Sequence, residues 1–222
     1  MKILFTVTAL LAGMLAGAPA QLVTNNYPGS SLSIPDGNTV GVMEQFYVSG
    51  VDGVIANIQI TLDITGGFNG DLYAYLAGPQ GQLAVLLNRV GLGTGSPFGN
   101  ANSGFAITFD DSSPNIHNYQ DGSYSIIGGQ LTGNWAPDGR NIDPQSSATV
   151  FEAASTGANF SSFLGSDPNG TWTFFIADLS SGGGTALLNS LALSIVTVPE
   201  PQTWAVLGGG LAAFCLLRIR RK

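Results

Sequence analysis

The sequence predicts an all-β, antiparallel, jelly-roll-like β-sandwich between two apolar ends. Apolar residues recur at every second position over several short stretches, which is the period of a strand with one buried face. Segments rich in glycine and proline, such as GGFNG, GPQG and SDPNG, separate these stretches and are typical of chain reversals. The roughly 175 residues between the ends are enough for one domain with a single core.

The most regular strand pattern is VIANIQITLDI, residues 54–64. Its predicted inner face consists of Val54, Ala56, Ile58, Ile60, Leu62 and Ile64. Five further strands supply apolar triplets: Leu72, Ala74 and Leu76; Leu83, Val85 and Leu87; Phe105, Ile107 and Phe109; Trp172, Phe174 and Ile176; Leu191, Leu193 and Ile195. No comparable stretch has the apolar stripe of a helix, so two antiparallel sheets packed face to face are expected.

The N-terminal end, residues 1–20, has the successive basic, apolar and small-residue regions of a secretory signal peptide. Lys2 precedes an apolar run, and Ala18 and Ala20 supply the small residues that signal peptidase accepts before its cleavage point. We expect cleavage after Ala20. The alternative is an uncleaved anchor, for which the apolar run is short.

The C-terminal end, residues 198–222, combines a turn, an apolar segment and a basic tail. The uncharged segment 203–217 is followed by Arg218, Arg220, Arg221 and Lys222, which predicts a short transmembrane helix with its basic side in the cytoplasm. A buried terminal helix of the domain would not explain these positive charges.

Pro199, Glu200 and Pro201 precede that apolar segment, and the whole order resembles the PEP-CTERM sorting signal. The resemblance implies recognition by exosortase, a membrane transpeptidase. It also implies an exported protein that is transiently anchored in the inner membrane and is then released to the cell surface or the extracellular space.

Charge and cysteine content narrow the function of the domain between the ends, residues 21–197. It holds 13 of the 14 acidic residues but only two basic ones, Arg89 and Arg140. Nucleic-acid binding needs clustered Lys and Arg, so a nucleic-acid partner is excluded. The single cysteine, Cys215, lies in the apolar tail, so the domain forms no disulfide of its own.

Residues 40–197 resemble the P domain (P/Homo B domain) that follows the catalytic domain of subtilisin-like proprotein convertases. The resemblance rests on Gly70-Asp71-Leu72, Gly78-Pro79-x-Gly81, Asp110-Asp111, Asn169-Gly170-Thr171-Trp172 and Asp178. The chain departs from the family at residues 64–67, where a His is usual, and at residues 188–191, where a Trp is usual. The resemblance implies a jelly-roll β-sandwich, and a partner or regulator of a separate subtilisin-like protease is one function that follows from it.

The sequence offers no signature of a serine protease. It has no Gly-x-Ser-x-Gly elbow, and its one histidine, His117, lies in a polar segment where we expect it to be solvated. A glycoside hydrolase that uses two carboxylates is an alternative, because two aspartates suffice for that chemistry. We expect a non-catalytic domain that requires no cofactor.

Aspartates at or near strand ends form a candidate calcium site, since Ca²⁺ prefers six to eight oxygen ligands. The candidates are Asp63, Asp71, Asp110, Asp111 and Asp178. The alternative is that these side chains only bond their own backbone in turns. Zinc is not expected, because the domain has one histidine and no cysteine.

Three aromatic residues are candidates for stacking on a sugar ring. Tyr73 and Tyr75 fall on the face opposite Leu72 and its neighbours, and Trp135 lies in a Gly-Asn-Trp-Ala-Pro segment expected to be a loop. An exopolysaccharide is therefore a candidate ligand. The alternative is that both tyrosines merely cover the outer sheet face. Together, these features predict an exported binding or structural module of the cell surface or matrix.

Overall fold

The computed structural model describes residues 20–27 and 31–198. The predicted signal peptide up to residue 19, the sorting motif 199–201, the apolar segment 203–217 and the basic tail 218–222 lie outside the described residues. Within the described ranges, no helix is long and apolar enough to cross a membrane.

Eleven strands and a few short helical turns make up the described domain. The strands are β1 (Gln21–Tyr27), β2 (Leu32–Ile34), β3 (Asn38–Val48), β4 (Val54–Thr65), β5 (Leu72–Ala77), β6 (Leu83–Asn88), β7 (Phe105–Phe109), β8 (Ser125–Ile127), β9 (Gln130–Trp135), β10 (Gly170–Asp178) and β11 (Ala186–Val198). The helical elements are α1 (Ala148–Ala153) and the 3-10 helices η1 (Asn69–Asp71), η2 (Ile116–Asp121) and η3 (Phe160–Phe163).

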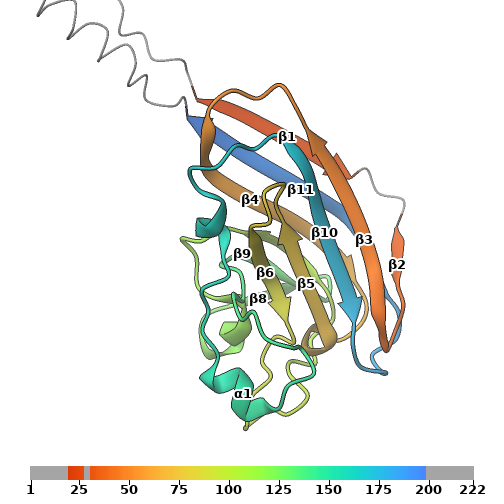
Figure 1. Ribbon diagram of the computed structural model, residues 1–222. Helices are drawn as coiled ribbons and strands as arrows, with labels where there is room; N and C mark the ends of the chain where they lie inside the picture. Colours follow the sequence, from red (N-terminus) through yellow and green to blue (C-terminus); the bar gives the residue numbers. More distant parts are fainter. Residues whose placement is uncertain (1–19, 28–30, 199–222) are drawn as a thin grey trace, which may run out of the picture.

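The strands form two sheets, which confirms the predicted all-β sandwich. The large sheet has the order β1-β11-β4-β7-β9-β8, with β2 also paired to β11, and the small sheet has the order β3-β10-β5-β6. In Figure 1 the small sheet lies in front of the large one. All pairs are antiparallel except β7 with β9, which is parallel and departs from the expected antiparallel arrangement.

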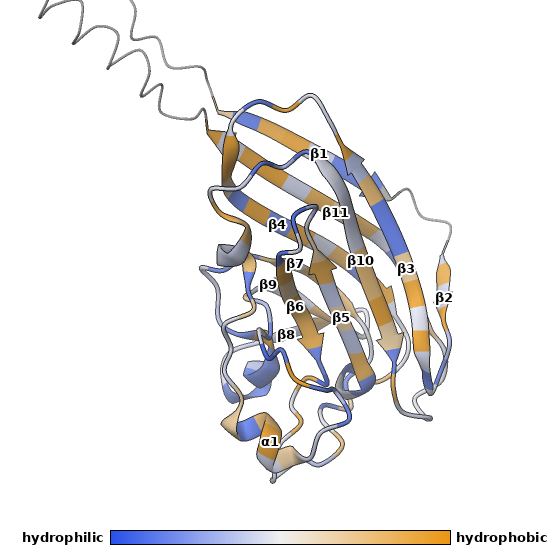
Figure 2. Ribbon diagram, in the orientation of Figure 1, coloured by the Kyte–Doolittle hydropathy of each residue, from blue (hydrophilic) through white to orange (hydrophobic). Residues whose placement is uncertain are grey.

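The core lies between the sheets and is filled by alternate residues of both. Trp172, Phe174 and Ile176 of β10 are fully buried, and Ile60 and Leu62 of β4 face them from the large sheet. The predicted triplets of β5, β7 and β11 are buried as well. Figure 2 shows the resulting alternation of apolar and polar residues along the strands.

The start of β4 departs from the predicted pattern. Ile55 is buried and Ala56 is exposed, the reverse of what strict alternation predicts. The pairing with β11 explains the reversal: Val196 faces Asn57, whereas Thr197 faces Ile55, so Ala56 is the extra residue of a β-bulge. A bulge of one residue exchanges the two faces of the strand on one side of it.

Strand β6 also differs from the prediction that Leu83, Val85 and Leu87 share one face. Val85 lies opposite Tyr75, on the outer face, whereas Leu87 lies opposite the inward Ala74. The irregularity between these pairs again exchanges the faces. Val85 is nevertheless buried, because a second segment runs along this edge and the Val85 N–H donates to the Ala158 carbonyl.

Candidate functional site

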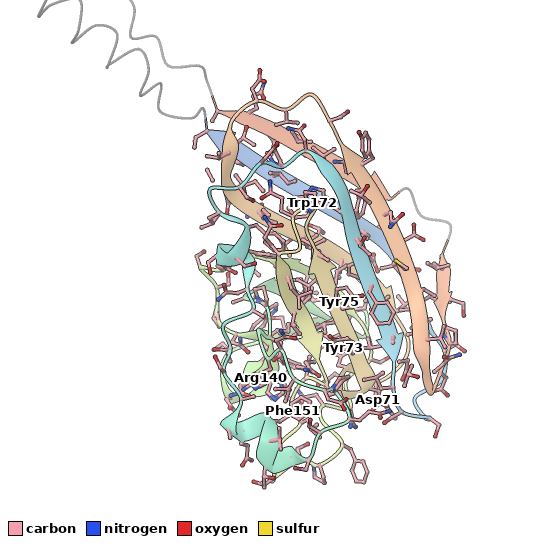
Figure 3. All side chains as sticks on the ribbon, in the orientation of Figure 1. Asp71, Tyr73, Tyr75, Arg140, Phe151 and Trp172 are labelled. Atoms are coloured by element: carbon pink, nitrogen blue, oxygen red, sulfur yellow. The ribbon has the colours of Figure 1, made fainter. Side chains whose placement is uncertain are left out.

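Three aromatic side chains cluster on the outer face of the small sheet. Tyr75 of β5 lies directly opposite Phe175 of β10, and their rings stack with centroids 5.1 Å apart and planes 20° apart. Tyr73 completes the group, with its ring centroid 6.0 Å from Tyr75 and 6.2 Å from Phe175. All three side chains are half-buried, so each keeps part of its ring open to solvent. Figure 3 shows the two tyrosines in succession along β5. We call these three residues the aromatic face.

Neighbouring strands extend the aromatic face without adding charge. Met43 of β3 lies opposite Phe175 and is 58% exposed, and Tyr47 of the same strand is 72% exposed. The neighbouring outward positions of β3, β5 and β10 are neutral: Gln45, Thr171, Thr173, Ala177 and Ala77. The result is a surface of aromatic, thioether, hydroxyl and amide groups.

The Tyr73 hydroxyl stays neutral under ordinary conditions. Burial raises its pKa above 10, and the nearby Tyr75 and Asp143 raise it further. A neutral phenol both donates and accepts hydrogen bonds, and it adds no charge to the aromatic face.

Two of the predicted aspartates meet at one end of the small sheet. Asp71 immediately precedes β5 and Asp178 ends β10, where it lies opposite Leu72. The Leu179 N–H donates to the Asp71 carbonyl over 2.9 Å and ties the two segments together. Figure 3 places Asp71 beside the start of β5, next to Tyr73.

The Asp178 carboxylate is buried and unpartnered. It is 0% exposed, and neither of its oxygens makes a hydrogen bond within the described part of the chain. Burial, followed by the charges of Asp71 and Asp36, raises its pKa from 3.8 to about 6; the nearby backbone N–H groups of Ser180 and Gly37, which lie outside hydrogen-bond geometry, oppose the rise only in part. The pKa of Asp71 is raised as well, mainly by burial, which Arg89 partly offsets.

The remaining three aspartates of the candidate calcium set lie elsewhere. Asp63 accepts hydrogen bonds from Gln130 and Asn189 on the large sheet. Asp110 and Asp111 follow β7 and are bonded separately: Asp110 accepts from two serine hydroxyls of its own turn, and Asp111 accepts from the N–H of Phe160, 49 residues along the chain.

The five aspartates therefore do not form one calcium site, and that part of the prediction is wrong. The turn chemistry weighed as the alternative accounts for Asp110: burial raises its pKa, but the bonds from its own turn outweigh burial and lower it overall. Over residues 20–27 and 31–198, no three His, Cys, Asp or Glu side chains are arranged as a metal cage.

The prediction that Trp135 lies in an open loop is wrong. Trp135 ends β9, is only 6% exposed, and donates its indole N–H to the Thr132 carbonyl over 3.1 Å. Its ring also packs edge-on against Tyr119, at a centroid distance of 6.0 Å. Pairing of β9 with β7 draws the indole into the core, so it offers no ring to a sugar.

The expectation that His117 is solvated is also wrong. Its side chain is buried in η2, where Nδ1 lies 2.6 Å from Asp138 Oδ2 and Nε2 lies 3.1 Å from the Leu92 carbonyl. Arg140 lies on the other side of Asp138, with Nη1 3.1 Å from Oδ1, and donates its Nε–H to the Phe151 carbonyl. Figure 3 shows Arg140 beside Phe151.

His117 and Arg140 line a hollow of about 440 Å³ at the loop end of the sandwich, together with Asn100 and Glu152, and Asp138 is buried behind them. In a serine triad the second ring nitrogen faces a hydroxyl nucleophile. Here a backbone carbonyl holds that position, and Glu152 already accepts from the Thr94 N–H and hydroxyl. This arrangement stabilises loops rather than activating a serine.

Sequence reasoning missed Phe175 and the partners of His117. A signal for Phe175 was present, because Trp172, Phe174 and Ile176 face inward and the alternating pattern then turns Phe175 outward. No such signal exists for His117, whose partner Asp138 is 21 residues away along the chain.

No family model and no curated protein matches this chain. Two solved structures are similar, both at 14% sequence identity: the serine protease of Aeromonas sobria (ASP) in complex with the chaperone ORF2, with a TM-score of 0.44, and the serine protease of Aeromonas sobria, with a TM-score of 0.43. The similar region covers 82% and 81% of this chain but only 28% and 27% of those chains. This chain thus spans less than a third of the length of the proteins it is similar to, and the similarity is too low to assign a function.

Proposed function

We propose that this chain is an exported, non-catalytic, jelly-roll-like β-sandwich module that binds a neutral polysaccharide on its aromatic face. The observation that carries the proposal is the contiguous, half-exposed group of Tyr73, Tyr75 and Phe175, whose neighbouring outward strand positions are uncharged. Aromatic rings offer apolar faces on which the C–H groups of a sugar ring pack, while hydroxyl and amide groups around them bond sugar hydroxyls.

Charge favours a neutral polysaccharide over an acidic one. The chain carries a formal net charge of −7, and a buried carboxylate pair, Asp71 and Asp178, ends the same sheet. An anionic polymer lying along the aromatic face would be repelled by this field, whereas a neutral glucan or galactan would not.

The two ends of the sequence complete the proposal. Cleavage by signal peptidase after Ala20, followed by recognition of Pro199-Glu200-Pro201 by exosortase, would deliver the domain through the inner membrane to the cell surface or matrix, where polysaccharides are found. This proposal includes two further points: that the domain is related to P domains, and that the C-terminal end is a sorting signal.

Affinity electrophoresis of the purified protein in gels that contain neutral glucans or galactans tests the binding. We expect Tyr75→Ala and Phe175→Ala to weaken retardation about tenfold or more, as expected when a stacking anchor worth more than about 1.4 kcal/mol is removed. Phe98→Ala is the matched control, because Phe98 is 80% exposed but lies on a loop outside the small sheet.

Two results would count against polysaccharide binding. Equal retardation of the wild type and both face variants would show that the aromatic face does not bind the polysaccharide. Absence of retardation, together with co-elution with a purified subtilisin-like protease, would replace the proposal with the protease-partner alternative.

A further inference from the structure

The hollow at the loop end of the sandwich is built from separate segments of the chain. The glycine-rich stretch 91–96 forms one wall, η2 forms another, and Arg140 and, from α1, Glu152 complete the lining. Its volume of about 440 Å³ lies within the roughly 300 to 1,000 Å³ of small-molecule pockets. The hollow is therefore large enough for a small ligand.

The inner wall of the hollow is buried and carries charge. Asp138 is fully buried and holds both His117, which is 3% exposed, and the Nη1 of Arg140. The Nε–H of Arg140 donates to the Phe151 carbonyl, so the guanidinium is fixed while its Nη2 makes no hydrogen bond within the described residues. Apolar side chains would stabilise a fold as well as such a buried network does. Its place behind an open hollow therefore favours a role in binding.

Other polar groups of the lining are also available to a ligand. Asn118 and Asp121 are exposed, and neither side chain makes a hydrogen bond within residues 20–27 and 31–198. Glu152 accepts from the Thr94 N–H and hydroxyl through Oε1 alone, and these bonds lower the pKa of its carboxyl. Its Oε2 stays an ionised acceptor. Asn100 is 7% exposed, and its Nδ2 has no partner in the described part of the chain.

The chemistry of the lining selects the class of ligand. Leu92 is the one apolar side chain among the described lining residues, so an apolar ligand finds no matching surface. An anion would meet Asp121 and Glu152, because the charge of Arg140 is already balanced by Asp138. A small cation would meet the free arm of the guanidinium. Sugar hydroxyls both donate and accept, so a neutral sugar satisfies the amides, the guanidinium and the carboxylates together.

Residues 140–143 border both the hollow and the aromatic face. The Arg140 side chain lines the hollow, while its carbonyl accepts a hydrogen bond from Asn88 Nδ2 over 2.9 Å. Asn88 lies opposite Tyr73 in the pair of β6 with β5. Asp143 also lies close enough to Tyr73 to raise the pKa of its hydroxyl. The end of a polysaccharide chain on the aromatic face can thus lie beside the hollow.

We infer that this hollow binds one neutral sugar unit, with Asp121 and Glu152 accepting from its hydroxyls and Arg140 and Asn118 donating to its oxygens. The inference rests on the proposed polysaccharide binding only for the source of this sugar, which is the terminal unit of the chain. The aromatic face then holds the chain along its length, and the hollow holds its end.

Ligand-observed NMR titration of the purified full-length protein with glucose, galactose and mannose tests the site. We expect at least one of these sugars to bind with a Kd on the order of 1 mM, as is usual for a ligand of this size. Tyr75→Ala should leave this Kd unchanged, because Tyr75 lies on the aromatic face and not in the hollow.

Asp121→Asn should weaken binding of the sugar about tenfold or more, because a charged acceptor is lost. The variant should fold, since Asp121 is exposed and makes no side-chain hydrogen bond within the described residues. Asn118→Ala is a second variant of the same kind and should weaken binding as well. Asp52→Asn is the matched control, because Asp52 is an exposed aspartate outside the hollow.

Three results would overturn the inference. One is the absence of binding by all three sugars, and another is an equal Kd in the wild type, Asp121→Asn and Asn118→Ala. The third is binding of methylammonium but of no sugar, which would make the hollow a cation site. If Tyr75→Ala abolishes sugar binding and Asp121→Asn does not, the aromatic face alone binds sugar, and the proposed function stands without this inference.

Discussion

Replacing Asp178 with asparagine should remove a specific pH dependence of stability in calcium-free solution. The pKa of Asp178 is about 6 in the folded protein and 3.8 ordinarily, so the folded state holds its proton more tightly. A raised carboxyl pKa contributes stability that is fully present below pH 3.8 and is lost as the pH rises through 6. The wild type should therefore become less stable between pH 4 and 7.5.

The magnitude follows from the two pKa values. At roughly 1.4 kcal/mol per pKa unit, the full difference corresponds to about 3 kcal/mol, of which about 2 kcal/mol falls between pH 4 and 7.5 because unfolding at pH 4 already releases part of the proton. Other carboxyl groups also titrate in this range, and those that do not interact with Asp178 contribute equally to the wild type and to the variant; Asp71 and Asp36 are coupled to Asp178. The difference between the two proteins therefore reports Asp178 together with its coupling to these two carboxylates.

Urea unfolding in EDTA, followed by tryptophan fluorescence, measures this difference. Trp172 is fully buried, so its emission reports loss of the core. We expect the loss of unfolding free energy between pH 4 and 7.5 to be about 2 kcal/mol larger in the wild type than in Asp178→Asn. The packing cost of the amide cancels, because it is present at both pH values. The same pH dependence in both proteins would refute the reasoning, and Asp52→Asn, which changes an exposed aspartate, should behave as the wild type.

Three further predictions test the packing of the sandwich and of its loop end. Phe174→Ala should lower the free energy of unfolding by about 3 to 5 kcal/mol, because its ring is fully buried. Phe175→Ala should lower it by less than half as much, because that ring is partly exposed. Equal losses in urea unfolding would contradict the assigned faces. Gly41→Ala should lower the Tm more than Gly50→Ala, although both positions have positive φ. A Cβ at Gly41 would collide with the Ile176 carbonyl and would lie 2.8 Å from the Phe175 ring, whereas a Cβ at Gly50 meets nothing. Equal Tm losses would argue against these contacts. His117→Gln should lower the unfolding free energy by about 1 to 3 kcal/mol, because buried Asp138 loses one hydrogen-bond partner while Arg140 remains; no effect in urea unfolding would show that the pair is not needed.

Much of the fold could be predicted because the alternation of apolar and polar residues can be recognised within each strand's own sequence. The inward rows Leu72-Ala74-Leu76 and Trp172-Phe174-Ile176 follow directly from a period of two, and the structure confirms both. The errors occur where a strand gains an extra residue. The bulge at Ala56 exchanges the two faces of β4 at that point, and no local sequence pattern predicts it.

The site was harder to predict, because it depends on contacts between distant segments. Tyr73 and Tyr75 could be placed on the outer face from their own strand, but their stacking on Phe175 depends on the pairing of β5 with β10, a hundred residues away. Trp135 shows the opposite error: its Gly-Asn-Trp-Ala-Pro context is typical of a turn, yet parallel pairing with β7 makes it a strand residue. Tertiary pairing overrides local turn preference there.

The same alternation separates what the fold requires from what a binding function requires. The inward row of β10 needs apolar side chains, and an apolar residue at position 178 would extend it without a buried charge. The outward row needs only strand-forming side chains, so threonine at position 175 would serve the sheet as well as phenylalanine does. Asp178 and Phe175 are therefore the two residues of this strand that folding alone does not explain, and they lie three positions apart on opposite faces. The exposed ring calls for an apolar partner, which is why a neutral sugar surface is the occupant that the outer face of this sheet favours.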